Sequence, residues 1–252
     1  MKKINKVAIT FWGTESYAEF LSEWYERLEE YFLPDMEKHY FVFTDAELEG
    51  TPDNITLMEI PHYGFPETFH KTFEEILKIE ELVSDYDWLV SVDADLYAQE
   101  KIDYNEFFDD SKKYFGVHHP CHYVGMMPHH QAPGSYDRNQ KSNAYVGDDI
   151  IDMNVYWQGC LWGGKIPYVF DMMRQIDQWT KEDIPRDSVG QYYEESYLNK
   201  FFLTHRNEVH TLMPDYAYPE MFKQHCDFPN KMMHLHKDLS LIHISEPTRP
   251  LH

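Results

Sequence analysis

The first half of the chain alternates between two patterns of hydrophobic residues. Candidate strands lie at 6–11, 40–44, 54–60 and 88–92, and the last of them is a short apolar run, typical of a strand buried on both faces. Between them, apolar residues recur at the spacing of one helix face over 16–32 and 67–83. Strands that alternate with helices in this way predict an α/β fold with a mainly parallel sheet and right-handed crossovers.

The second half of the chain follows a different plan. Its candidate strands and helices lie at 114–118, 155–161, 166–181 and 194–204. Residues 129–149 are polar and without periodicity, and a loop this long in a compact chain is usually functional or mobile. We expect few core anchors in this loop and in the segment after Pro219.

The charge balance restricts the function. The 252 residues include 22 Lys and Arg against 44 Asp and Glu, a formal charge of −22 with histidine neutral. Nucleic acids and anionic membranes need basic surfaces, so neither is an expected partner. A phosphate-bearing substrate would need a cation to offset the local repulsion. The aromatic share of 16% fits a bulky core or rings that pack on sugars, and composition alone favours the core.

The cysteines and the chain ends indicate the compartment. Cys121, Cys160 and Cys226 are too few for a disulfide framework, and their odd count suits a reducing compartment. The apolar start predicts a first strand rather than a signal peptide, and no apolar stretch approaches the roughly 20 residues of a membrane span. We therefore expect a cytoplasmic protein. Residues 240–252 resemble translated sequencing-adapter sequence more than a genuine proline-bounded tail, and we treat them as a non-native tail.

Two aspartates at a strand end form a candidate metal site. Asp93 and Asp95 directly follow the apolar run 88–92. Ligands in open α/β sheets bind outside the carboxyl ends of the strands. Two carboxylates two residues apart can share one divalent cation there, and oxygen ligands suit Mn²⁺ or Mg²⁺. A second such pair, Asp85 and Asp87, precedes the strand, and we interpret it as part of a solvated turn.

Seven short segments together resemble a known family. They are Tyr40-Phe-Val-Phe-Thr-Asp45, Asp87-Trp-Leu-Val-Ser-Val-Asp-Ala-Asp95, Phe115-Gly-Val-His-His-Pro120, Asn143-Ala-Tyr145, Tyr156-Trp-Gln-Gly-Cys-Leu-Trp-Gly-Gly164, Glu194-Glu-Ser-Tyr-Leu-Asn-Lys200 and Met213-Pro-Asp-Tyr216. In this order and with similar spacing, the chain resembles glycosyltransferase family six, the group of the ABO blood-group transferases and α-1,3-galactosyltransferase. The resemblance runs from about Ile9 to Glu220.

The resemblance implies a GT-A fold, with a Rossmann-like, mainly parallel central sheet flanked by helices and a smaller acceptor-binding part in the second half. The implied domain is 1–239, with a nucleotide-binding half at 1–95 and an acceptor-binding half at 96–239. The implied reaction is retaining transfer of galactose or N-acetylgalactosamine from a UDP-sugar to the 3-hydroxyl of a plain or fucosylated galactoside. Mn²⁺, or Mg²⁺, would be held by Asp93 and Asp95 against the diphosphate. The chain lacks the anchor and stem of the animal members, and so resembles a soluble bacterial or phage-type member.

The resemblance also assigns roles to single residues. Glu195 matches the family's acidic residue beneath the anomeric carbon, where a carboxylate acts as nucleophile or as charge stabiliser. The matches to acceptor-binding positions are His119, Tyr192 and Glu194. The matches to donor-binding positions are Phe11, Trp12, Gly13 and Tyr17 around uridine, and Gln158, Gly159 and Cys160 around the donor sugar. We expect Gly163 and Gly164 to pack against backbone rather than to cradle phosphate.

Three alternatives remain open at this point. One is another GT-A transferase, for example a glycogenin-like one, that shares only the D-x-D motif. Another is a sugar-binding module without turnover. The third is a zinc hydrolase, because histidines and a cysteine cluster at His118, His119, Cys121, His122, His129 and His130, although in no regular zinc spacing. His234 and His236 alternate like the edge of a strand, and we interpret them as structural.

Overall fold

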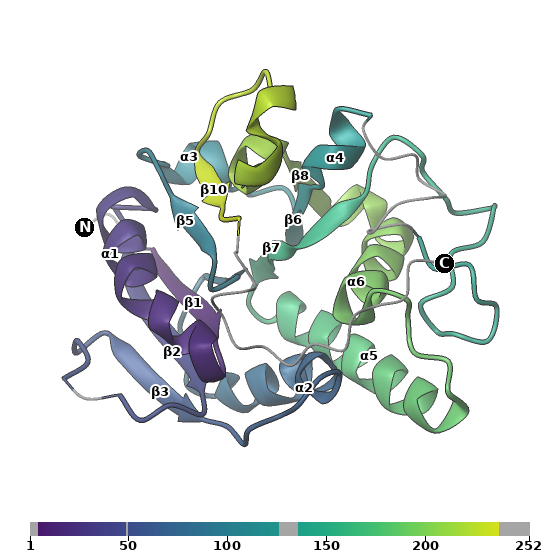
Figure 1. Cartoon of the computed structure of the whole chain (residues 1–252), viewed down its shortest axis with the longest axis horizontal. Helices are drawn as coiled ribbons and strands as arrows, with labels where there is room; N and C mark the ends of the chain where they lie inside the picture. The colour runs from purple at the N-terminus through teal and green to yellow at the C-terminus, as the bar shows by residue number, and fades with distance from the viewer. Residues whose placement is uncertain (1–4, 49, 126–135, 237–252) are drawn as a thin grey trace.

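One large sheet organises the molecule (Figure 1). The computed structural model describes residues 5–48, 50–125 and 136–236. The sheet has seven strands in the order β3-β2-β1-β4-β7-β6-β8. Their bounds are β1 Lys6–Trp12, β2 Glu37–Thr44, β3 Ile55–Glu59, β4 Trp88–Val92, β6 Tyr114–His118, β7 Trp157–Lys165 and β8 Val209–Leu212.

The strand directions confirm the predicted α/β class with a mostly parallel central sheet. β1 pairs in parallel with β2 and with β4, so that Ile9 lies between Tyr40 and Val90. β7 runs antiparallel to both of its neighbours, β4 and β6. Because of this reversal, the beginning of β7 lies beside the carboxyl end of β4, where Leu161 pairs with Val92. Residues of both strands therefore meet at one edge of the sheet.

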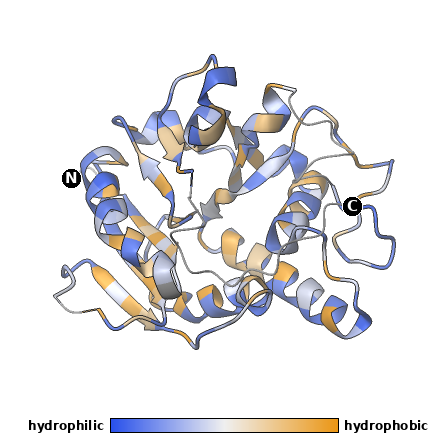
Figure 2. Ribbon diagram, in the orientation of Figure 1, coloured by the Kyte–Doolittle hydropathy of each residue, from blue (hydrophilic) through white to orange (hydrophobic). Residues whose placement is uncertain are grey.

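Helices cover both faces of the sheet. Alternate residues of β1 enter opposite cores, with Val7, Ile9 and Phe11 on the side of α1 and Ala8 on the side of α2, α5 and α6. Figure 2 shows hydrophobic and hydrophilic residues alternating along α2 and α5, as expected for helices with one buried face. The helices are α1 Leu21–Tyr31, α2 Glu67–Ile76, α3 Tyr104–Phe107, α4 Pro120–Tyr123, α5 Tyr168–Asp183 and α6 Tyr193–Thr204.

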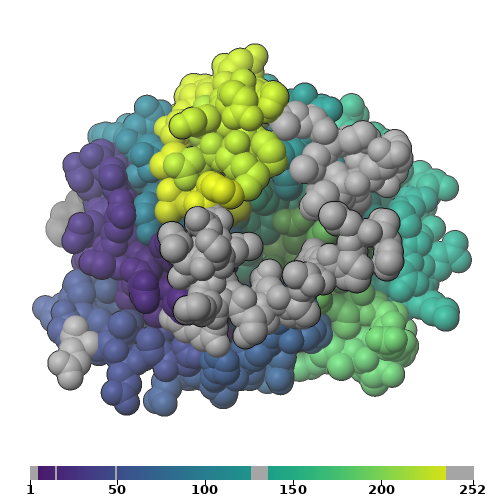
Figure 3. Space-filling model, viewed as in Figure 1, coloured from purple at the N-terminus to yellow at the C-terminus, as the bar shows by residue number. Residues whose placement is uncertain are grey.

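A small second sheet joins distant parts of the chain. Its strands, in the order β5-β10-β9, are β5 Leu96–Ala98, β9 Tyr218–Pro219 and β10 Met232–His234. β10 runs antiparallel to β5 and places His234 opposite Leu96. In Figure 3 the C-terminal part of the described chain, drawn yellow, lies against the blue-green chain that holds β5. The sequence pattern did not predict β5, β8 or β9, because runs this short show no periodicity.

The predicted boundaries need local correction. The helix expected over 16–32 begins as a 3-10 helix, Glu15–Phe20, before α1, and the helix expected over 67–83 leaves the α conformation after Ile76. Further 3-10 turns are Leu77–Ile79, Ile184–Arg186, Arg206–Glu208, Pro214–Ala217 and Glu220–His225. β7 starts at Trp157 and extends past the predicted end at 161 to Lys165. Gly163 lies so close to β4 that a Cβ atom would stand 2.1 Å from the Leu89 carbonyl oxygen. This confirms that Gly163 packs against backbone.

The long polar loop is better anchored than expected. Residues 126–135 lie outside the described ranges, so the expectation can be judged only for 136–149. There, Tyr136, Ala144 and Val146 are buried in the core beside α5 and α6. The Asp137 carboxylate accepts hydrogen bonds from the backbone N–H groups of Asn139 and Gln191, both at 2.7 Å. The expectation of few core anchors was wrong for this part because polar side chains fasten its backbone.

In the segment after Pro219, the 3-10 helix Glu220–His225 contains no buried residue, as expected, but Met232 of β10 is fully buried in the core on the α1 side. The expected non-native tail, 240–252, lies outside the described residues. In the part of the chain that the structure describes, no helix combines the length and apolar character needed to cross a membrane.

Candidate active site

The two aspartates stand where β4 ends. Asp93 follows the last residue of β4 and Asp95 precedes the first residue of β5. The turn is held by its backbone: the Asp93 N–H donates to the Cys160 carbonyl oxygen at 2.9 Å, and the Trp24 Nε1–H donates to the Asp93 carbonyl oxygen at 3.1 Å. Asp93 is exposed, whereas Asp95 is 2% exposed. One carboxylate therefore faces solvent and the other faces the protein.

His234 joins this pair from the far end of the described chain. Its Nε2 lies 3.2 Å from Oδ2 of Asp95. Asp93, Asp95 and His234 can each offer one ligand atom, and these atoms lie within 4.8 Å of one another. Two carboxylates and an imidazole make a donor set suited to a divalent cation such as Mn²⁺ or Mg²⁺. The sequence pattern favours a structural role for His234, whereas the structure places it in a group that could hold a metal ion.

Glu195 lies in the first turn of α6, on the side of β7 opposite to the aspartates. Its Oε1 accepts a hydrogen bond from the Tyr156 hydroxyl at 2.8 Å, and its Oε2 accepts one from the Gly159 N–H at 2.7 Å. Burial raises the pKa of this carboxyl, while the Gly159 N–H, the Tyr156 hydroxyl and His234 act to lower it. Both oxygens are thus fixed in place by protein donors.

The first residues of β7 connect Glu195 to the aspartates. The Gly159 N–H holds Glu195, and the carbonyl oxygen of the next residue, Cys160, holds Asp93. Burial raises the pKa of the Cys160 thiol well above its ordinary value, and the charges of Asp93, Asp95 and Glu195 add to this effect. All three carboxylates therefore surround the same short stretch of one strand.

Gln158, Gly159 and Cys160, the predicted donor-sugar residues, face different surroundings. The Gln158 side-chain nitrogen lies 3.1 Å from Nδ1 of His234. A Cβ atom on Gly159 would lie 3.4 Å from Oε2 of Glu195, so the backbone approaches that carboxylate closely. The Cys160 side chain is 2% exposed and belongs to the core on the α1 side. Gly159 therefore lies directly against Glu195, whereas the Cys160 side chain is buried in the core.

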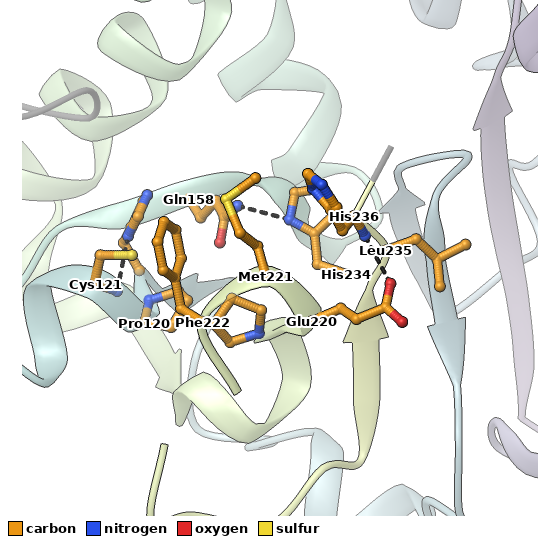
Figure 4. A pocket seen from close by; sticks show the side chains of 11 residues that line it. Pro120, Cys121, Gln158, Glu220, Met221, Phe222, His234, Leu235 and His236 are labelled. Atoms are coloured by element: carbon orange, nitrogen blue, oxygen red, sulfur yellow. Dashed lines mark hydrogen bonds between the residues drawn. The ribbon is translucent and has the colours of Figure 1, made fainter. Parts of the chain in front are cut away.

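A cavity opens next to His234 (Figure 4). Its volume is about 240 Å³, and its lining includes His119, Gln158, Glu220, Met221, Phe222 and His234. Nδ1 of His119 accepts a hydrogen bond from the Cys121 N–H at 3.2 Å. Burial, followed by the charges of His122, His234 and His118, lowers the pKa of His119 to about 3. His119 is therefore neutral, with its proton on Nε2.

The other predicted acceptor residues begin α6. Tyr192 is the N-cap, and its backbone N–H donates to Oγ of Ser196 at 2.9 Å. Glu194 lies in the first turn beside Glu195, and both are partly exposed. The beginning of the helix thus presents an aromatic ring and two carboxylates.

The residues predicted to bind uridine lie at the end of β1 and just after it. Phe11 is fully buried against Trp24, with ring centroids 5.0 Å apart, so its ring belongs to the core. Trp12 is partly exposed, and its Nε1–H donates to Oγ1 of Thr68 at 3.1 Å. A Cβ atom on Gly13 would lie 2.4 Å from the Phe11 ring, which explains the glycine. Tyr17 packs against the core from the following 3-10 helix.

The described histidines of the cluster around His119 do not form a zinc site. His119 and His122 lie with ring centroids 5.1 Å apart, but His129 and His130 fall outside the described residues. Across 5–48, 50–125 and 136–236, the cluster that could bind a metal is the one formed by Asp93, Asp95 and His234. The metal-ligating chemistry of the described chain therefore lies at the D-x-D motif.

A mostly parallel sheet flanked by helices, with a D-x-D pair at a central strand end, is the architecture of the GT-A class of glycosyltransferases. Residues 1–241 match the family Glycosyltransferase family 6. The chain belongs to this family and is a glycosyltransferase.

Two relatives illustrate the range of the family. The chain is 23% identical to the O-antigen biosynthesis glycosyltransferase WbnI of Escherichia coli, over 85% of this chain and 88% of that protein. It is 26% identical to the human globoside alpha-1,3-N-acetylgalactosaminyltransferase 1, over 85% of this chain. The chain spans 61% of the length of that human protein.

Proposed function

We propose that this protein is a metal-dependent, retaining glycosyltransferase that moves N-acetylgalactosamine or galactose from a UDP-sugar to the 3-hydroxyl of a plain or fucosylated galactoside. The observation that carries the proposal is the meeting of Glu195 with Asp93 and Asp95 at the first residues of β7. A sugar diphosphate needs a cation at its phosphates and a carboxylate at its anomeric carbon. This arrangement would supply both, because Gly159 contacts Glu195 and the next residue, Cys160, contacts Asp93.

The two groups divide the chemistry. A divalent cation bound by Asp93 and Asp95 would neutralise the diphosphate and favour its departure. Glu195 would lie beneath the anomeric carbon, either as nucleophile or as a charge that stabilises the oxocarbenium-like centre. Because the Tyr156 hydroxyl and the Gly159 N–H hold its two oxygens, the carboxylate needs little reorganisation when positive charge develops.

The cavity beside His234 is the proposed acceptor site, within the half 96–239. His119 is neutral, and its Nδ1 accepts a hydrogen bond from the Cys121 N–H. Its Nε2–H can therefore donate a hydrogen bond to a hydroxyl group of the acceptor sugar. Tyr192 and Glu194, at the beginning of α6, would complete the site with an aromatic surface and a carboxylate acceptor.

The donor would lie along the half 1–95 and reach β7. The partly exposed Trp12, at the end of β1, is the proposed stacking surface for uracil, with Gly13 and Tyr17 beside it. For the sugar, Gly159 carries no side chain that would compete with an acetamido group, so we favour UDP-N-acetylgalactosamine. The activity that the name of the human relative states supports the same choice.

A small grid of reactions tests the proposal. Both UDP-sugars are offered to galactosides with and without 2-linked fucose, each with Mn²⁺ or with EDTA. We expect an α-1,3-linked product with retained configuration, formed with Mn²⁺ and abolished by EDTA. Binding of UDP-sugar with neither transfer nor hydrolysis would identify a sugar-binding module instead. A more than ~10-fold preference for UDP-galactose in kcat/KM, about 1.4 kcal/mol, would overturn the donor choice.

A further inference from the structure

The two ring nitrogens of His234 face different partners. Nε2 lies 3.2 Å from Oδ2 of Asp95, and Nδ1 lies 3.1 Å from the side-chain nitrogen of Gln158 (Figure 4). The backbone around the ring is fixed, because His234 pairs with Leu96 and the Leu235 N–H donates to the Asp95 carbonyl oxygen at 3.0 Å. The ring is thus held between a candidate metal ligand and a side-chain amide.

A neutral imidazole has one protonated and one unprotonated nitrogen, and only the unprotonated nitrogen can bind a metal. With the Gln158 amide donating to Nδ1, the ring proton is on Nε2 and points toward Asp95. To bind a cation beside Asp95, the ring must move this proton to Nδ1. The change requires a hydrogen-bond acceptor next to Nδ1.

Gln158 can supply that acceptor. Its Oε1 is buried and has no hydrogen-bond partner among the described residues. Rotation of the amide by half a turn would exchange Oε1 with the amide nitrogen and place Oε1 opposite Nδ1. The Nδ1–H would then donate to Oε1, and the lone pair of Nε2 would face the aspartates. Partners of this kind, which fix the tautomer of a metal-bound histidine, are common in metalloproteins.

We propose that His234 is a third protein ligand of the cation and that Gln158 is the positioning residue that sets its tautomer. This inference rests on the proposed metal-dependent function. The geometry fits, because cation–ligand bonds of about 2.1 Å place adjacent ligands of an octahedron about 3.0 Å apart, close to the 3.2 Å between Nε2 and Asp95. An imidazole nitrogen also favours a transition ion such as Mn²⁺ over Mg²⁺.

Mn²⁺ itself is the probe for His234. The full chain is titrated with Mn²⁺ by EPR, and pulsed EPR then detects nitrogen coupled to the bound ion. We expect nitrogen coupling in the wild type and its loss in His234→Asn, with binding of Mn²⁺ at least ~10-fold weaker. The matched control is His236→Asn, an exposed histidine two residues away, which keeps the coupling. Persistence of the coupling in a folded His234→Asn variant would overturn the proposal.

Gln158 is tested on the same binding equilibrium, without any sugar donor. We expect Gln158→Leu to weaken Mn²⁺ binding about 10-fold and Gln158→Glu, which retains an acceptor, to restore it. In the His234→Asn background, Gln158→Leu should add no further loss, because its partner is absent. Unchanged Mn²⁺ binding in Gln158→Leu would refute the role of Gln158.

The outcomes also separate this inference from the proposed function. A wild-type protein that binds Mn²⁺ and needs it for transfer, but shows no nitrogen coupling, refutes only the role of His234. Full transfer in EDTA refutes the proposed metal dependence itself, and the inference with it.

Discussion

The two acidic regions beside β7 are held in opposite ways. Glu195 has one protein donor on each oxygen, the Tyr156 hydroxyl and the Gly159 N–H. Asp93 and Asp95 bring ligand atoms within 4.8 Å of each other and of His234. Their turn is fixed through the backbone groups of Asp93, by the Cys160 carbonyl oxygen and the Trp24 side chain. Like charges this close repel unless a cation lies between them.

The way each region is held indicates which positive charge it would interact with. The Glu195 region is already organised in the protein alone, so it can meet a developing positive charge without rearrangement. On the proposed function, a cation would offset the repulsion between Asp93 and Asp95. Substitutions at Glu195 should therefore act on the chemical step, whereas substitutions at the aspartates should act on cation binding first.

The sharpest test of this contrast is Glu195→Gln. The amide keeps the shape, but it has one acceptor oxygen instead of two and no charge, so we expect kcat to fall at least ~1,000-fold. UDP and Mn²⁺ binding, measured by calorimetry, should stay close to wild type. Glu194→Gln is the comparison, and there we expect mainly a higher acceptor KM. Near-normal kcat in Glu195→Gln would remove Glu195 from the mechanism.

The aspartates come next in expected effect. The double variant Asp93→Asn with Asp95→Asn should lower transfer at least ~100-fold, because the diphosphate then meets no bound cation. Mn²⁺ titration should show the binding loss directly. The matched control is Asp85→Asn with Asp87→Asn, at the opposite end of β4, where Asp85 pairs with Lys6 at 2.6 Å. If both double variants lose activity equally, the contrast between the two ends of the strand is wrong.

Tyr156→Phe probes how Glu195 is held. Loss of a hydrogen bond to a charged group costs about 1.5–3 kcal/mol, so we expect kcat to fall at least ~10-fold. The Tyr156 hydroxyl lowers the pKa of Glu195, so its removal should raise that pKa. Because the active form is the carboxylate, the acidic limb of the pH–kcat profile should move to higher pH. In Tyr136→Phe, whose hydroxyl bonds backbone at Asp152, the limb should not move.

Gly159→Ala should have the smallest effect. Its new methyl group would lie 3.4 Å from Cβ and Oε2 of Glu195, an ordinary contact, so we expect a folded protein with a few-fold lower kcat/KM. The loss should be greater for UDP-N-acetylgalactosamine than for UDP-galactose. In Gly163→Ala the methyl group would overlap the Leu89 carbonyl oxygen, at 2.1 Å, and we expect misfolding. Thermal unfolding and donor kinetics distinguish the two variants.

The sequence predicted those features that lie in contiguous residues. β4 and β6 were placed at their observed bounds because each is short and mainly apolar, and Asp93 and Asp95 followed from their place at a strand end. Glu195 could be assigned only through the family resemblance, because its partner Tyr156 lies 39 residues away. The sequence places His234 on a strand edge but not beside Asp95, because the two residues lie far apart in the chain and no local spacing joins them.

The pairing of β5 with β10 also has a consequence for how the protein is made. β5 leaves the ribosome well before β10, which lies near the end of the described chain. During translation, the large sheet has all of its strands while the edge of β5 still lacks its neighbour. Closing the small sheet is therefore a late, long-range folding step, and such steps are slow. A nascent chain that stops before Met232 would contain the aspartates without the strand that packs beside them.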